Sequence, residues 1–404
     1  MNLRTRIYNQ LYPNYYAVIM VMYFLSLFVL TIPRAAIIGI IMLSIDIVLL
    51  TKIKMKMYLG EFWVFVYICF CCFTGIRYLS NSVPINVFFA SISYSLLPML
   101  FVFMRDREKY IKTIDITFKA IFVSIILAWV LYIIAPPFYG EYLVYHSLSS
   151  REDFEWIRAA LQGVYGITAL GTFSAISGLY FFYRYISEER IKYLIVFGIS
   201  TITLFFTGRR SAIGAFIVTY ALEIFLFIIR GGKKSKRVGY AILVVCLLGG
   251  FIVLQKMDEV ILILNRVLDI SNAINERNSN WKEALNSIHG MDWFIGSGYG
   301  SRSHLVANIK GITGVFDNNY LELLLEIGVV GMILFSACIL IALFPKRYII
   351  RFEGDKISKQ YKDYSLLATL IILVYMIQAI GSNVWEFQIL APLFWMCIGI
   401  KIHE

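Results

Sequence analysis

Two adjacent arginines stand in the turn Thr207-Gly-Arg-Arg-Ser211, between two apolar runs. An arginine near the bilayer centre costs about 2.5–3.5 kcal/mol on insertion scales, so it usually faces an anion or a water-filled cavity. A guanidinium offers a planar fork of donors that fits phosphate oxygens. Arg209 and Arg210 are therefore candidates to bind a diphosphate. The alternative is that both side chains extend to lipid headgroups.

A third arginine opens the segment Arg277-Asn-Ser-Asn-Trp281 of a long polar insert. Asn280 and Glu283 have the spacing of a capping box, which predicts a short helix over 281–288 that ends at Gly290. Arg277 would then precede a helix N-terminus, where backbone N–H groups already favour anions. We predict that Arg277 and Trp281 contact substrate, with a solvated loop arginine as the alternative.

Two further motifs follow in the same insert. The glycines of Gly296-Ser-Gly-Tyr-Gly300 permit a sharp turn or a close backbone approach, but no strand and no phosphate-loop spacing accompany them. Asp317-Asn318 then leads into an apolar run that carries Glu322, Glu326, Gly328 and Gly331. The two glutamates are four residues apart and share one helix face, where they need a polar cavity or a cation. Ordinary acids at the membrane surface are the alternative.

A second polar stretch, 136–160, mixes aromatic side chains such as Trp156 with several carboxylates. Flat rings beside carboxylates suit sugars, which present apolar faces and hydroxyl edges. We predict that Trp156 binds substrate in this loop. The alternative is a belt of aromatic residues at the membrane interface.

The elements that must position these residues are membrane helices. The 404-residue chain is 59% hydrophobic and 16% charged, and its apolar runs are long enough to cross a bilayer. Only helices satisfy their backbone in lipid at this length, so we predict an all-α integral membrane protein of about twelve transmembrane helices. The predicted spans are 15–32, 35–51, 61–76, 85–104, 114–135, 161–182, 193–207, 211–229, 238–255, 320–344, 364–381 and 388–400.

Orientation follows from Lys and Arg, which concentrate in alternate connecting segments. The bias predicts that both termini are cytoplasmic and that the loops 136–160 and 256–319 face outside, within a single polytopic domain covering 1–404. The net charge of +11 is therefore attributed to topology and not to nucleic acid. The six cysteines all fall within predicted spans and the histidines show no ligand spacing, so no metal is expected.

In this order, the four motifs resemble those of the O-antigen polymerase (Wzy-type) and O-antigen ligase superfamily of bacterial envelope enzymes. The resemblance covers the C-terminal half in motifs and the whole chain in topology. Arg210 matches the arginine of the family's turn motif, because Arg209 takes a place usually held by serine. Arg277 matches the loop arginine. The ligases carry histidine where this chain has Asp317, and this difference favours a polymerase.

The resemblance implies glycosyl transfer at the outer face of the bacterial cytoplasmic (inner) membrane, where O-antigen or capsular polysaccharide is built. The donor would be an oligosaccharide on undecaprenyl diphosphate, with no cofactor and with a chain-length regulator as partner. Arg210 and Arg277 would stabilise the departing diphosphate. Asp317 would orient or deprotonate the acceptor hydroxyl. Arg209, Trp281, Asn318, Glu322, Glu326 and Trp156 would bind substrate.

Two other functions remain open from the sequence. A ligase would move finished glycan to an acceptor by the same chemistry. A flippase or another transporter would place its charges in a central cavity, and Asp46 and Glu223, both inside predicted spans, could form a proton relay. The outer position predicted for the arginines favours surface chemistry.

Overall fold

The protein is described here by a computed structural model. It describes residues 3–25, 58–79, 95–104, 106–134, 166–230, 237–240, 242, 278, 281–302, 318–344, 359–385 and 389–404. These residues are mostly helical, and no strand occurs among them. The loop 136–160 with Trp156 lies outside this set, as do Asp46, Arg277 and Asp317.

The helices of the described chain follow one another in sequence. They are α1 (Leu3–Leu25), α3 (Leu59–Leu79), the 3₁₀ helix η1 (Leu97–Phe103), α5 (Arg107–Ile134), α8 (Ile167–Glu188), α9 (Ile191–Phe206), α10 (Arg210–Arg230), α14 (Asp292–Ile295), α16 (Asn319–Leu343), α17 (Lys359–Gln378) and α18 (Ala391–Ile402).

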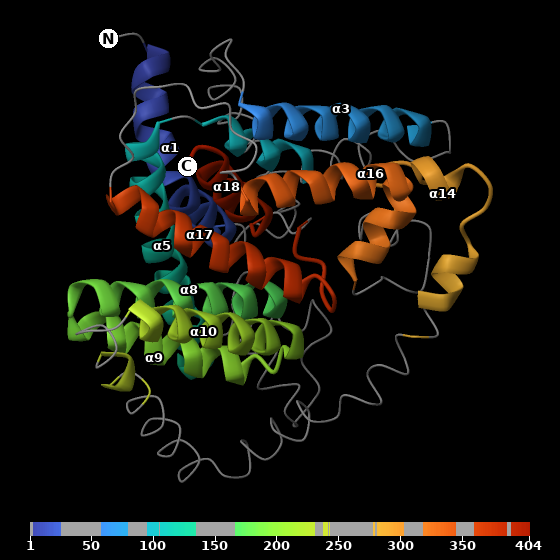
Figure 1. The fold of residues 1–404 in the computed structure, drawn as a ribbon. Coiled ribbons are helices and arrows are strands. Elements are labelled where there is room, and N and C mark those ends of the chain that lie inside the picture. The colour runs from blue at the N-terminus through green and yellow to red at the C-terminus, as the bar shows by residue number, and fades with distance from the viewer. Residues whose placement is uncertain are drawn as a thin grey trace.

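Two groups of helices lie on either side of α17 (Figure 1). α8 packs against both α9 and α10, and α16 packs against α3. α17 contacts α10 on one side and α18 on the other, and so joins the two groups. One hydrophobic core runs through the whole bundle, from Tyr12 in α1 to Ile402 in α18.

Four of these helices are long and apolar enough to cross a membrane: Leu59–Arg77, Arg107–Ile134, Arg210–Ile229 and Asn319–Leu343. Large apolar side chains such as Phe65, Ile133 and Ile229 are exposed along them, as expected for surfaces that face lipid. The predicted class of α-helical membrane protein is confirmed. The predicted total of twelve spans and the long outer loop extend beyond the described residues.

Two predicted spans differ from the structure. Residues 97–103 form a 3₁₀ helix, not part of a continuous α-helix over 85–104, and Pro98 stands in its first turn. The predicted span 320–344 corresponds to α16, but α16 breaks at Gly328, whose φ is 62°. The chain direction changes at this break (Figure 1). Glycine adopts this backbone conformation without the steric cost that a side chain would add.

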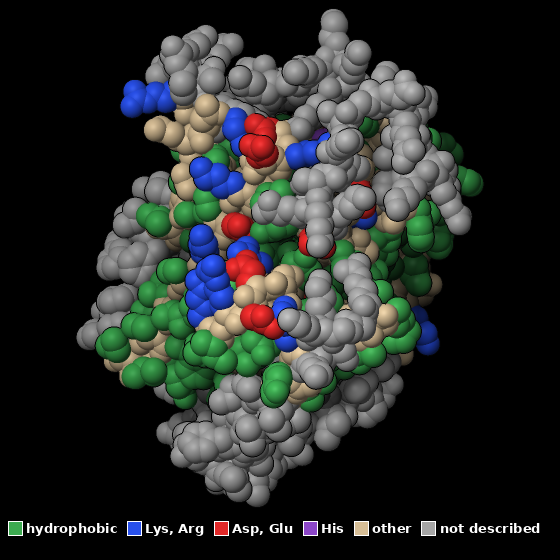
Figure 2. Space-filling view, turned by 60° about the vertical axis from the view of Figure 1, so that its left-hand side comes forward, with side chains coloured by type: hydrophobic (Ala, Val, Ile, Leu, Met, Phe, Trp, Pro, Cys, Tyr) green, Lys and Arg blue, Asp and Glu red, His purple; other side chains and the backbone are tan. Residues whose placement is uncertain are grey.

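Charged residues gather at the end of the bundle where α8 ends and α9 begins. Figure 2 shows basic and acidic side chains interleaved across one face. Their ion pairs include Arg237 with Glu189, and Lys109 with Asp106.

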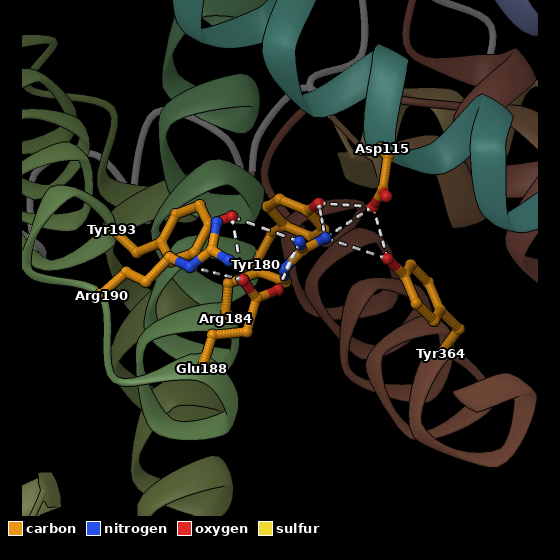
Figure 3. Close-up of polar contacts among 7 residues, drawn as sticks. All are labelled: Asp115, Tyr180, Arg184, Glu188, Arg190, Tyr193 and Tyr364. Carbon is orange, nitrogen blue, oxygen red and sulfur yellow. Dashed lines mark hydrogen bonds and ion pairs between the residues drawn. The ribbon is translucent and has the colours of Figure 1, made fainter. Parts of the chain in front are cut away.

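The most connected of these charges is Arg184, which joins four helices (Figure 3). Its Nη1 donates to Asp115 Oδ1 at 2.9 Å and to the Tyr364 hydroxyl at 3.1 Å. Its Nη2 donates to the Tyr193 hydroxyl at 3.2 Å and forms an ion pair with Glu188. The side chain thereby links α8 to α5, α17 and α9, so this end of the bundle is fixed by a charged centre.

Candidate functional site

The turn between α9 and α10 places the two arginines at the opposite end of α8. Thr207 ends α9 and its hydroxyl donates to Leu204 O at 2.7 Å. Gly208 follows with a φ of 57°, and α10 then begins at Arg210. The tight turn that the sequence predicts is therefore confirmed.

The two arginines of this turn have different surroundings. Arg209 donates from Nη2 to the hydroxyl of Thr168, in the first turn of α8. Its Cβ also lies 3.4 Å from the place where a Cβ on Gly171 would stand. Arg209 therefore ties the turn to α8, whereas Arg210 occupies the first position of α10. Both side chains are partly buried.

The short helix predicted within the insert 256–319 is present. Residues 281–286 are helical, and Gly290 follows with a φ of 53°. Ala284 and Ile288 form a small hydrophobic cluster with Leu321 and Leu325 of α16. Trp281 packs against the same cluster. The apolar face of the short helix and the Trp281 indole therefore both contact α16.

The glycine-rich segment contacts the break in α16. Ser297 N–H donates to Leu325 O at 2.8 Å, and Gly298 N–H donates to Glu326 O at 2.9 Å. In a continuous helix these carbonyls would accept from residues 329 and 330. The loop therefore supplies donors to the backbone carbonyls beside the break.

The side chain of Glu326 takes part in the same contact. It is fully buried, and its Oε1 accepts the Arg302 N–H at 2.8 Å. Arg77 of α3 holds the other end of the loop, by donating to Gly296 O at 3.0 Å and to Asp292 at 3.1 Å. Glu326, predicted to bind substrate, is thus part of the contact between the loop and α16.

Asn318 caps the start of α16. Its Oδ1 accepts from Tyr320 N–H at 3.0 Å and from Leu321 N–H at 3.1 Å. This is the standard role of asparagine at a helix N-cap, and both hydrogen bonds are accepted by its Oδ1 atom. Its amide nitrogen stays a candidate for contact with substrate.

Glu322 lies one turn further along and is 1% exposed. Its Oε2 accepts from Asn319 Nδ2 at 3.3 Å and from Asn383 Nδ2 at 2.5 Å. A buried carboxylate is costly unless hydrogen bonds stabilise its charge. The two amides supply such bonds, so Glu322 belongs to a built polar cluster.

The segment 379–385, after α17, was not predicted to contribute to the site. The hydroxyl oxygens of Ser382 and Ser211 lie 2.8 Å apart, next to the arginine turn. Asn383 reaches Glu322 from the same segment. The sequence shows only a short connection with Gly, Ser and Asn between two apolar runs, which is typical of many loops.

The structure therefore brings the arginine turn and the start of α16 to one end of the bundle, although more than a hundred residues separate them in sequence. Among the described residues no group of acidic, histidine and cysteine side chains could hold a metal ion. Basic donors at the start of α10 and carboxylates on α16, joined through segment 379–385, could bind an anion and orient a hydroxyl group. Arg277, Asp317 and Trp156 stay predictions, since they lie outside the described residues.

Comparison with known proteins gives one family. Residues 195–336 match the family model described as O-antigen ligase. The match begins in α9 and ends in α16, so it includes the arginine turn, the insert 256–319 with its glycine-rich loop, and the break at Gly328. The comparison with curated proteins finds no match.

The family indicates a glycan enzyme of the O-antigen ligase or polymerase type, acting on a lipid-linked glycan. Together with the apolar helices, it indicates a multi-pass bacterial membrane protein. Residues 195–336 therefore match the O-antigen ligase family, and this match supports the resemblance to the superfamily of O-antigen ligases and polymerases.

Proposed function

We propose that the protein is a polymerase that joins oligosaccharide repeat units carried on undecaprenyl diphosphate. The product would be O-antigen or capsular polysaccharide, made at the outer face of the cytoplasmic membrane. The observation that carries the proposal is the link between the arginine turn and the start of α16, made by Ser211 with Ser382 and by Asn383 with Glu322. It joins the turn that carries a candidate diphosphate-binding residue to the start of α16, which follows Asp317, the residue proposed to act on the acceptor.

In the proposed reaction an acceptor sugar hydroxyl attacks the anomeric carbon of the donor sugar. The new bond is C–O, and the bond between that carbon and the diphosphate oxygen breaks. The diphosphate leaves with the electron pair, and Arg210 and Arg277 stabilise the charge that develops on it. Asp317 accepts the proton of the hydroxyl and passes it to water.

A ligase is the second candidate, because the matching family is described by that activity. Both reactions use a lipid diphosphate as leaving group and differ in the acceptor. Asp317 in place of the histidine of the ligases favours the polymerase. The acceptor decides between them, so the test must follow where the glycan goes.

The test replaces Arg210 or Arg277 with alanine in cells that make the glycan, and compares the glycans by gel. Membrane insertion is checked by immunoblot. Arg190→Ala is the matched control, because Arg190 is 62% exposed and pairs with Glu188 at 3.5 Å at the other end of the bundle. We expect single repeats in place of a ladder in the first two variants, and a normal ladder in the control.

Other outcomes point elsewhere. A full ladder that stays on its lipid carrier would indicate a ligase. Repeat units that accumulate on the cytoplasmic side would indicate a flippase. An unchanged, fully transferred ladder in both arginine variants would overturn the assignment of the site.

A further inference from the structure

The segment 379–385 is attached to the start of α16 by more than one side chain. Asn319 Oδ1 accepts from the backbone N–H groups of Val384 and of Trp385, the second at 3.1 Å. Asn319 N–H in turn donates to Ala379 O at 3.0 Å. Asn319 is fully buried, so these bonds fix its position between the two segments.

These bonds also decide which way the Asn319 amide points. An amide oxygen accepts and an amide nitrogen donates. Because Oδ1 is used by two backbone N–H groups, Nδ2 must face Glu322. Asn383 donates to the same carboxylate oxygen, so Glu322 Oε2 is held by one amide from each segment.

The segment is also attached to the arginine turn, through Ser382. Ser382 Oγ donates its hydrogen to Gly381 O at 2.6 Å. Since a hydroxyl has one hydrogen, Ser211 must be the donor in the pair with Ser382. Ser211 is the residue after Arg210, so this bond acts directly on the first turn of α10.

One layer deeper, Gln378 Nε2 donates to the Thr172 hydroxyl of α8 at 2.7 Å, and both residues are fully buried. The end of α17 is therefore also held against α8, the helix to which Arg209 is tied. The hydrogen bonds form an unbroken path from α16 through segment 379–385 to the turn that carries Arg210.

We propose that Ser382 and Asn383 are positioning residues for Arg210. Asn383 fixes the segment by its hydrogen bond to Glu322. Ser382 accepts a hydrogen bond from Ser211 and so fixes the first turn of α10, which carries Arg210. The ligand served is the diphosphate of the glycan donor, so the inference rests on the proposed function. Positioning matters because a displacement of about 1 Å at a reacting group can lower the rate about a hundredfold.

The first test uses purified protein, a lipid-linked repeat unit and single-turnover kinetics. Ser382→Ala removes one neutral hydrogen bond, and we expect transfer to slow about fivefold. Asn383→Asp places a second carboxylate beside Glu322, and we expect a loss of about a hundredfold with donor affinity within about twofold. The control Ser200→Ala breaks a similar buried pair, Ser177 with Ser200 at 3.0 Å, and should keep the wild-type rate.

The same substitutions are then made in an Arg210→Lys background. Lysine keeps the charge but lacks the planar fork, so the background retains a measurable rate. If Ser382 and Asn383 act through Arg210, their substitutions should slow transfer less than twofold further. If each substitution slows transfer as much in this background as it does in the wild type, the inference is overturned. Such additive effects would show that Ser382 and Asn383 act independently of Arg210.

A double variant guards against misfolding. In Glu322→Gln with Asn383→Asp, donor and acceptor exchange places and the hydrogen bond can reform. We expect the transfer rate to recover to within about tenfold of the wild type. Glu322→Gln alone is the control for the carboxylate itself. A folded double variant that stays a hundredfold slow, while Glu322→Gln alone keeps a rate within about tenfold of the wild type, would overturn the inference. If Arg210→Lys alone has no effect, the proposed function fails instead, whatever the other variants do.

Discussion

At the scale of single residues, the charged centre at Arg184 shows how buried polar groups are kept in this bundle. Asp115 Oδ1 accepts from Arg184, from Tyr180 at 2.6 Å and from Tyr364. Three donors therefore converge on one carboxylate oxygen and stabilise its charge, although the Asp115 side chain is still 27% exposed. Removing one partner would leave the others with unmet hydrogen-bonding needs.

A double-mutant cycle at Asp115 and Arg184 measures this coupling. We expect an interaction energy of about 1.5–3 kcal/mol, the range for hydrogen bonds to charged groups, because both side chains are mostly buried. The measurement is resistance to unfolding in detergent of Asp115→Ala, Arg184→Ala and the double variant. The pair Arg190–Glu188 is the comparison, with its arginine mostly exposed, and should give at most about 1 kcal/mol. Equal coupling in the two pairs would contradict this account.

At the scale of elements, the break in α16 and the glycine-rich loop depend on each other. A Cβ on Gly296 would lie 2.1 Å from Glu326 O, and one on Gly328 would lie 2.4 Å from the backbone of Phe294. Both glycines also have positive φ, at 74° and 62°. The two backbone segments cannot move apart to make room for a Cβ, because hydrogen bonds from Ser297 and Gly298 to Leu325 and Glu326 join them. Glycine is therefore required on both sides of the contact.

We predict that Gly296→Ala and Gly328→Ala each destabilise the protein by about 3 kcal/mol or more, from backbone strain plus steric overlap. Gly290→Ala is the matched control: its φ is 53°, but a Cβ there would meet nothing within 4 Å. It should cost only the strain, about 1–2 kcal/mol. Thermal unfolding of the three variants in detergent gives the comparison. A cost at Gly290 as large as at the other two glycines would show that overlap plays no part.

At the scale of the whole molecule, the two ends of the bundle differ in kind. One end has interleaved charges on α5, α8 and α9, and the other has the arginine turn, segment 379–385 and the loop on α16. Lys and Arg gather on the cytoplasmic side of membrane proteins. This bias predicts that the charged end faces the cytoplasm and that the candidate site faces outside.

Cysteine labelling tests this orientation. Lys282 and Lys192 are both exposed, and they lie in the insert 256–319 and at the start of α9. In a cysteine-free background, Lys282→Cys should react with a membrane-impermeant maleimide in intact cells. Lys192→Cys should react only after permeabilisation. The reverse pattern would place the candidate site in the cytoplasm and rule out a reaction at the outer face.

The amino-acid sequence determined the features that depend on neighbouring residues. Apolar runs and Lys/Arg placement gave the membrane class, and α9, α10 and α16 begin and end within a few residues of the predicted spans. The short helix at 281–286 followed from its capping residues and periodicity. These properties arise from hydropathy and from interactions four residues apart or fewer, which sequence displays directly.

Tertiary structure alone decided how the site is joined. The apolar run around Gly328 predicts one continuous helix. At the break, carbonyls of α16 accept instead from the backbone N–H groups of Ser297 and Gly298, about thirty residues earlier. Segment 379–385 looks like an ordinary connection until Ser382 and Asn383 meet Ser211 and Glu322. Such contacts join residues distant in sequence through single hydrogen bonds, which leave no periodic pattern in the chain.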